Sequence, residues 1–169
     1  IPQHQGGAYF IEVRHPDGIG GCGFSYSIEV ESRTACADEY EPDNVPADAP
    51  GIEFDAWRRH NFHTCCTTPG DDVVGADDWV RFAAYEGITY TIETSGLSSG
   101  ADTVLELYGI ARLYNPDAHW LVKNDDAEGS GSGSRIVWQA PTTDDYFLKV
   151  SPFDERHGGC DVQYDLRVL

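Results

Sequence analysis

The chain has 169 residues, 40% of them apolar and 12% aromatic, which allows one domain or slightly more with a real core and disfavours disorder. A net charge of −18 argues against nucleic acid and anionic membranes as partners, and no run reaches the roughly 20 apolar residues of a membrane span. The excess of acidic residues leaves three interpretations: calcium binding, solubility in high salt, or an ordinary solvated surface.

The N-terminal stretch predicts two strands of a hairpin. Large apolar and polar residues alternate through residues 24–31, and a period of two is typical of a half-buried strand. Residues 9–14, earlier in the chain, are the other expected strand of this hairpin.

This pair recurs at the other end of the chain. The matching strands are residues 9–13 and 146–150, followed by residues 26–30 and 164–168. Each intervening loop contains Gly-Gly-Cys, ending at Cys22 in one copy and at Cys160 in the other. Such a repeat indicates a module that occurs more than once. We therefore expect residues 1–31 to be the closing hairpin of a preceding module, or a donor strand for a neighbour, in a longer tandem array.

Residues 32–50 are acidic and carry three prolines, Pro42, Pro46 and Pro50. Because proline cannot donate to a strand ladder, this segment is expected to be a linker or an extended edge segment. Residues 51–70 are the least regular part of the chain.

From residue 78 onward the pattern predicts an antiparallel β-sandwich. Short runs rich in valine, isoleucine, tyrosine and threonine alternate with turn residues at roughly ten-residue spacing. The expected strands are residues 79–84, 88–94, 103–108, 119–123 and 134–139, followed by the repeated pair. The fold class is therefore all-β, a jelly-roll-like sandwich of about eight to nine strands over residues 51–169.

The cysteines fit two disulfides in one module. Cys36, Cys65, Cys66 and Cys160 form an even set, whereas Cys22 belongs to the preceding repeat. This arithmetic suits an oxidising compartment. Cys160 would pair with one of Cys65 and Cys66, and Cys36 with the other, although the sequence does not fix the connectivity. Buried free thiols in a cytosolic protein are the alternative.

Several of these segments together resemble a known family. They are residues 41–44, 78–82, 90–94, 102–108, 124–126, 134–136 and 146–150. Their ordered set is similar to the bacterial pre-peptidase C-terminal domain, a β-sandwich related to the collagen-binding domains of clostridial collagenases. The resemblance covers about residues 39–169. It implies an extracellular, non-catalytic jelly-roll module, often calcium-binding, that attaches to a substrate or stabilises its parent. Residues 51–70 depart from the family's compact pattern.

The resemblance also implies a place for calcium, which takes six to eight oxygen ligands. In the related collagen-binding domains an acidic linker and a following Asp-rich loop share the ion. The matching positions are Glu39, Glu41, Asp43 and Asn44 with Asp71, Asp72 and Asp77. The residues themselves show the same two acidic clusters: Glu39, Glu41, Asp43 and Asn44 alternate along an extended segment, and Asp71, Asp72, Asp77 and Asp78 stand just before the first strong strand. A solvated acidic face is the alternative reading.

A second calcium candidate is the polar loop after residue 123. Its oxygen-bearing side chains are Asn124, Asp125, Asp126 and Glu128. The glycine- and serine-rich residues that follow would let the loop wrap around an ion, but they suit a bare loop equally well.

Catalytic residues are not indicated. His60 and His63 precede Cys65 and Cys66, and imidazole with thiolate suits Zn²⁺ or copper. The stretch lacks the glutamate of a zincin, however, and oxidised cysteines leave no thiolate. We therefore expect surface histidines beside disulfides. Residues 96–100, Gly-Leu-Ser-Ser-Gly, have the spacing of a nucleophile elbow, but Ser98 and Ser99 lie in a glycine-bounded turn with no arranged base in evidence.

The sequence therefore favours an extracellular structural or adhesive module, stabilised by calcium and disulfides. Its expected partners are copies of itself, in tandem or through head-to-tail strand addition into a filament, and an extracellular protein or polysaccharide is a further candidate. The alternative function is a substrate-targeting domain of a secreted peptidase or other hydrolase. An enzyme is disfavoured.

Overall fold

The computed structural model describes residues 13, 37–63, 77–98, 100–113, 119–129, 131–154 and 157–169. The chain divides into two compact units, Ile1–Arg33 and Thr34–Leu169, and Val13 is the one described residue of the first. The hairpin expected within residues 1–31 thus lies outside the described residues and stays a prediction. All that follows concerns the second unit.

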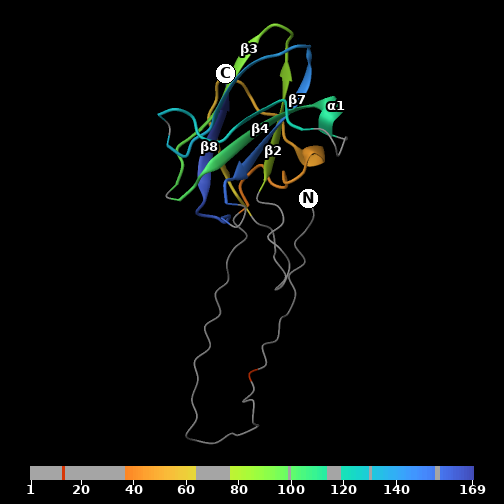
Figure 1. The fold of residues 1–169 in the computed structure, drawn as a ribbon. Helices are drawn as coiled ribbons and strands as arrows, with labels where there is room; N and C mark the ends of the chain where they lie inside the picture. The colour runs from red at the N-terminus through yellow and green to blue at the C-terminus, as the bar shows by residue number, and fades with distance from the viewer. Residues whose placement is uncertain are drawn as a thin grey trace, which may run out of the picture. The chain divides into compact units, whose positions relative to one another are not determined.

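Within its described residues, this unit is a sandwich of two four-stranded antiparallel sheets, as the sequence predicted. One sheet has the order β2-β7-β4-β5 and the other β1-β8-β3-β6; Figure 1 shows β2, β7 and β4 of the first. The first sheet comprises β2 (Asp78–Ala84), β7 (Asp144–Pro152), β4 (Thr103–Gly109) and β5 (Val122–Asn124). The second comprises β1 (Arg58–Asn61), β8 (Gln163–Val168), β3 (Thr89–Ser95) and β6 (Arg135–Gln139). Two short helical turns, η1 (Pro46–Asp48) and α1 (Ile110–Leu113), complete the described elements.

Alternation along the strands builds the core between the sheets. Every second residue of β8 is buried, as is every second residue of the middle of β3, because successive side chains of a strand point to opposite faces. Leu105, Leu107 and Leu148 from the facing sheet are fully buried in the same cluster, each contributing about 1.5–3 kcal/mol to folding. No helix among the described residues has the length and apolar character needed to cross a membrane.

Two strands differ from expectation. β5 covers only Val122–Asn124, shorter than the expected strand at 119–123. β1 was not predicted at all, because its sequence Arg-Arg-His-Asn shows no apolar alternation. β1 forms because it pairs with β8: His60 of β1 lies directly opposite Tyr164 of β8. The pairing comes from tertiary context, which local sequence does not report.

The proline-bearing acidic stretch lies along the outer edge of β2. The amide of Trp79 donates to the carbonyl of Asp43 at 2.8 Å, and that of Arg81 donates to the carbonyl of Pro50 at 2.9 Å. A parallel bridge joins Gly51 to Arg81. Prolines are tolerated at a sheet edge because few ladder bonds need their missing donor. The consequence for function is that the acidic residues before Asp43 are brought to the start of β2.

Candidate metal centre

Two buried carboxylates form the centre of the site. Asp43 comes from the edge segment, and Asp78 is the first residue of β2. Asp78 shares the inward side of β2 with Val80 and Phe82, so alternation places its carboxylate inside the sandwich. Asp43 is 0% exposed and Asp78 is 1% exposed. Glu41 completes the group, since one carboxylate oxygen from each of the three residues lies within 4.8 Å of the other two.

These carboxylates lack the partners that burial demands. Both carboxylate oxygens of Asp43, Oδ1 of Asp78 and Oε1 of Glu41 accept no hydrogen bond. The remaining oxygen of Asp78 accepts a 2.5 Å hydrogen bond from the phenol of Tyr164. Burying an ionised carboxylate without a partner costs several kcal/mol. The cluster must therefore hold either protons or a cation.

The pKa values of the two buried aspartates are raised, in keeping with their missing partners. Burial, and then the negative charges of Glu41 and Asp38, raises the pKa of Asp43 to about 8. Burial, and then Asp43, raises the pKa of Asp78 well above its usual range. Burial and the neighbouring Asp78 also raise the pKa of Tyr164, so its phenol remains a donor. A cation would displace the protons from the two aspartates, since metal ligands must be deprotonated.

The two histidines are not on the surface, so that expectation was wrong. His60 is 0% exposed and His63 is 9% exposed. The imidazole of His60 stacks on the ring of Tyr164, with 5.5 Å between centroids, because residues opposite each other on paired strands share a face. Nδ1 of His60 lies 3.8 Å from a carboxylate oxygen of Asp43 and 3.8 Å from one of Asp38. Nδ1 of His63 lies 3.5 Å from Oε1 of Glu41.

The structure brings together only part of the set expected for calcium. Glu41 and Asp43 join the cluster, whereas Glu39 is exposed. Asp77 forms an ion pair with Lys149 at 2.9 Å, and the side-chain amide of Asn44 donates to the carbonyl of Asp77 at 3.5 Å. Asp71 and Asp72 lie outside the described residues.

The residue that replaces Asp77 in the cluster is its neighbour, Asp78. Alternation with Val80 and Phe82 along β2 was the available signal, because only one of two adjacent aspartates faces the interior. No sequence signal linked Tyr164 to this place.

The polar loop after residue 123 also forms an acidic cluster, but the residues in the cluster differ from those expected. Asp125 and Asp126 lie with Asp102, one carboxylate oxygen of each being within 4.8 Å of the others. Asn124 instead shapes the loop: its side chain donates to the carbonyl of Asp126 and accepts from the amide of Arg135. Burial, then Asp126 and Asp125, raises the pKa of Asp102. Sequence reasoning missed Asp102 because it precedes β4, on a separate part of the chain.

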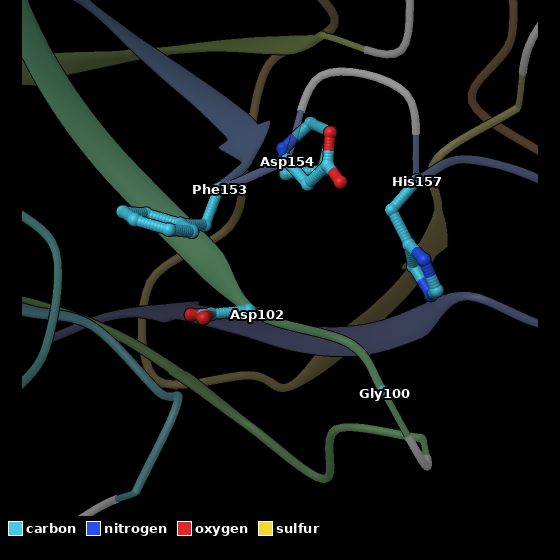
Figure 2. Close-up of a pocket in the computed structure, with 6 residues that line it drawn as sticks. Gly100, Asp102, Phe153, Asp154 and His157 are labelled. Atoms are coloured by element: carbon cyan, nitrogen blue, oxygen red, sulfur yellow. The ribbon is translucent and has the colours of Figure 1, made fainter.

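A small cavity of about 150 Å³ adjoins Asp102. Figure 2 shows the side chains of Asp102, Phe153 and His157 around it. Gly100 has φ +85°, and a Cβ there would lie 3.3 Å from Nε2 of His157. The imidazole thus packs closely over the glycine.

Of the cysteines, Cys160 alone falls within the described residues, and it is disulfide-bonded. Cys22, Cys36, Cys65 and Cys66 lie outside the described residues. The pairing within the module therefore stays a prediction.

Among known proteins, solved structures are similar to this chain. No protein-family model matches the chain, and no curated protein matches it. PliG, a periplasmic inhibitor of g-type lysozyme from Aeromonas hydrophila, is 15% identical, with a TM-score of 0.46 over 71% of this chain and 94% of that one. The chain is likewise similar to the pre-peptidase C-terminal domain of a Bacillus anthracis collagenase, at 19% identity and a TM-score of 0.48 over 72% of this chain and 94% of that one.

Proposed function

We propose that this chain is a non-catalytic, extracellular β-sandwich module whose fold is held by a calcium ion at Glu41, Asp43 and Asp78. The observation that carries the proposal is the pair of buried aspartates without sufficient partners. One comes from the edge segment and the other from β2, so a shared cation would fasten that segment to the sandwich. The module would serve as a structural or adhesive unit.

The donor set fits calcium. Calcium prefers carboxylate oxygens at 2.3–2.6 Å and takes six to eight of them. The cluster offers four oxygens that accept no hydrogen bond: Glu41 Oε1, both carboxylate oxygens of Asp43, and Asp78 Oδ1. Backbone carbonyls and water would complete the shell. The ion would lower the electrostatic cost of three close carboxylates, which the protein otherwise meets by holding protons.

The test is thermal unfolding in excess chelator and in calcium, for the wild type, Asp78→Asn and Asp77→Asn. At 100 times the dissociation constant, calcium should stabilise the wild type by about 2.7 kcal/mol, a rise in Tm of roughly 5–10 °C. Asp77→Asn is the matched control, because its side chain pairs with Lys149 and it should keep the rise. Asp78→Asn should lose it. An equal rise in Asp78→Asn, or none in the wild type, would refute the proposal.

The structural role rests on the sequence repeat that matches residues 9–30 with residues 146–168. We propose that copies of the module follow one another, in one polypeptide or by strand addition between chains. The mass of the native species on a denaturing gel, with and without reductant, tests this. A mass far above 18.6 kDa under both conditions supports a covalent array, and a ladder that reductant collapses supports subunits linked by disulfides. One band near the single-chain mass under both conditions contradicts the covalent forms and leaves strand addition, which sizing of the native species then tests.

A further inference from the structure

The cavity of about 150 Å³ beside Asp102 has no residue in common with the proposed calcium centre. It lies where the start of β4 meets the end of β7, since Thr103 and Pro152 are opposite each other in the sheet. The amide of Phe153 donates to the carbonyl of Asp102 at 3.0 Å, which holds the two walls together. The described residues that line the cavity are Gly100, Asp102, Pro152, Phe153, Asp154 and His157.

The carboxylate of Asp102 lacks a partner for one of its oxygens. Oδ1 of this residue is buried and accepts no hydrogen bond. Asp125 and Asp126 add negative charge next to it, because one carboxylate oxygen of each lies within 4.8 Å of one from Asp102. An unpartnered buried acceptor is costly, and a charged donor forms the strongest hydrogen bond with a carboxylate. The cavity therefore favours a cationic ligand.

The other walls of the cavity indicate an organic cation. Its volume exceeds the roughly 30 Å³ that one water molecule occupies in the liquid, so there is room for several non-hydrogen atoms. The ring of Phe153 is 62% exposed and, with Pro152, supplies apolar surface. Figure 2 shows this ring and the Asp102 carboxylate at one end of the cavity and the imidazole of His157 at the other. Aromatic rings attract cations, and methylene groups pack on apolar surface.

A lysine side chain combines a positive charge with methylene groups. Its methylenes would contact Phe153 and Pro152. Its ammonium carries three donors, which suits carboxylates on two different walls, Asp102 before β4 and Asp154 after β7. The planar guanidinium of arginine instead pairs best with both oxygens of one carboxylate.

The lysine has to come from another protein. This chain contains two lysines, and both are ion-paired within it. Lys123 pairs with Glu106 at 2.8 Å, and Lys149 pairs with Asp77 at 2.9 Å. The net charge of −18 would attract a basic partner to the module.

We propose that this cavity binds a lysine side chain of a basic extracellular protein, with Asp102 pairing with the ammonium and Phe153 contacting the methylenes. The inference rests on the proposed adhesive role and names a partner for it. It uses none of Glu41, Asp43 and Asp78, so the cavity and the calcium centre are tested by different variants.

The test is an NMR titration of the full, unreduced chain with Nα-acetyl-lysine amide, at low salt and in chelator, which keeps calcium away from Asp102. The amide resonances of Asp102, Phe153 and His157 should shift and reach saturation. The norleucine analogue has the same side-chain carbons without the ammonium and should leave them in place. The arginine analogue should bind about threefold more weakly. Equal binding of the arginine analogue would refute the choice of lysine, and shifts spread over the surface without saturation would refute the cavity.

Variants of the lining locate the binding. Asp102→Asn should weaken lysine binding about fivefold or more, because a charge-assisted hydrogen bond is lost. Asp144→Asn removes an equal charge at the other end of β7 and should change the affinity by less than about twofold. Phe153→Leu alters an exposed side chain, keeps apolar surface and should weaken binding by about two- to fivefold. Wild-type affinity in either Asp102→Asn or Phe153→Leu would overturn the inference.

The results separate this inference from the calcium proposal. Stabilisation by calcium without lysine binding refutes the lysine site and leaves the calcium centre intact. Lysine binding without any effect of calcium on stability supports the lysine site and refutes the calcium centre. Absence of both effects refutes both proposals.

Discussion

The phenol of Tyr164 donates a 2.5 Å hydrogen bond to the carboxylate of Asp78. Tyr164 lies on β8 and Asp78 on β2, so this bond crosses the sandwich from one sheet to the other. Both side chains are buried. It is a polar link through an apolar core, and it orients the carboxylate at the centre of the proposed cation site.

Tyr164→Phe should therefore destabilise the protein. The substitution removes one hydroxyl and leaves both oxygens of Asp78 without a donor, at a cost of about 1–3 kcal/mol. Urea unfolding in chelator measures the loss, and calcium titration should show weaker binding as well. Tyr85→Phe, which alters an exposed ring, is the control and should change stability by about 0.5 kcal/mol or less. A wild-type free energy of unfolding in Tyr164→Phe would show that the link has no energetic role.

Chelated protein should lose stability as the pH rises from 7 to 9. The folded-state pKa of Asp43 is raised to about 8, first by burial, from an unfolded value of about 3.9. A group with a raised folded pKa stabilises most below its unfolded pKa, and that contribution disappears as the pH rises through the folded value. Urea unfolding in chelator across this interval measures the slope.

Asp43→Asn provides the comparison for this pH dependence. An amide does not titrate, so the difference in stability between the variant and the wild type should change between pH 7 and pH 9. With calcium bound, the wild type should not show the decline, because the ion replaces the proton. A pH-independent difference between the two chelated proteins would mean that Asp43 does not hold a proton near neutrality.

Glu106 should show the opposite pH dependence. Burial raises the pKa of this carboxyl, but hydrogen bonds from Lys123 and Tyr108, each at 2.8 Å, outweigh burial and lower it overall. A lowered folded pKa stabilises above the unfolded value, and this contribution is lost as the pH falls through the folded value. Glu106→Gln should cost about 1–2 kcal/mol at pH 7, and this penalty should shrink below pH 4. Exposed Glu53→Gln is the control; an identical pH profile in both variants would contradict the prediction.

The second acidic cluster should bind calcium more weakly than the first. Its carboxylates, from Asp102, Asp125 and Asp126, are more exposed than Asp43 and Asp78, so less is gained by neutralising them. Calorimetry of the wild type should resolve a second, weaker event that Asp102→Asn removes. Asp144→Asn, an exposed residue at the start of β7, should retain it. A one-site isotherm for the wild type would rule out this second site.

Alternation of side chains made most of the sandwich predictable. β2, β3, β4, β6, β7 and β8 each lie within two residues of an expected strand, because a period of two marks a half-buried strand directly in the sequence. β1 could not be found in this way. Its residues carry no such period, and its place depends on the pairing of His60 with Tyr164 on a strand about a hundred residues later.

The site was predictable where it is local in sequence and not where it depends on packing. Glu41 and Asp43 stood out as closely spaced acids ahead of a sandwich. The choice between Asp77 and Asp78 depended on which faces the interior, which the alternation of β2 decides. Asp102 and the buried histidines could not be assigned, because their contacts come from elements distant in sequence.

The most direct test is a crystal structure of the protein grown in calcium, with anomalous data collected at a wavelength where calcium scatters appreciably. An anomalous peak should lie between Asp43 and Asp78, with oxygens of both and of Glu41 at 2.3–2.6 Å. Absence of such a peak, with the aspartates hydrogen-bonded to one another or to water, would show that protons alone satisfy the buried carboxylates and would contradict a calcium ion at this site.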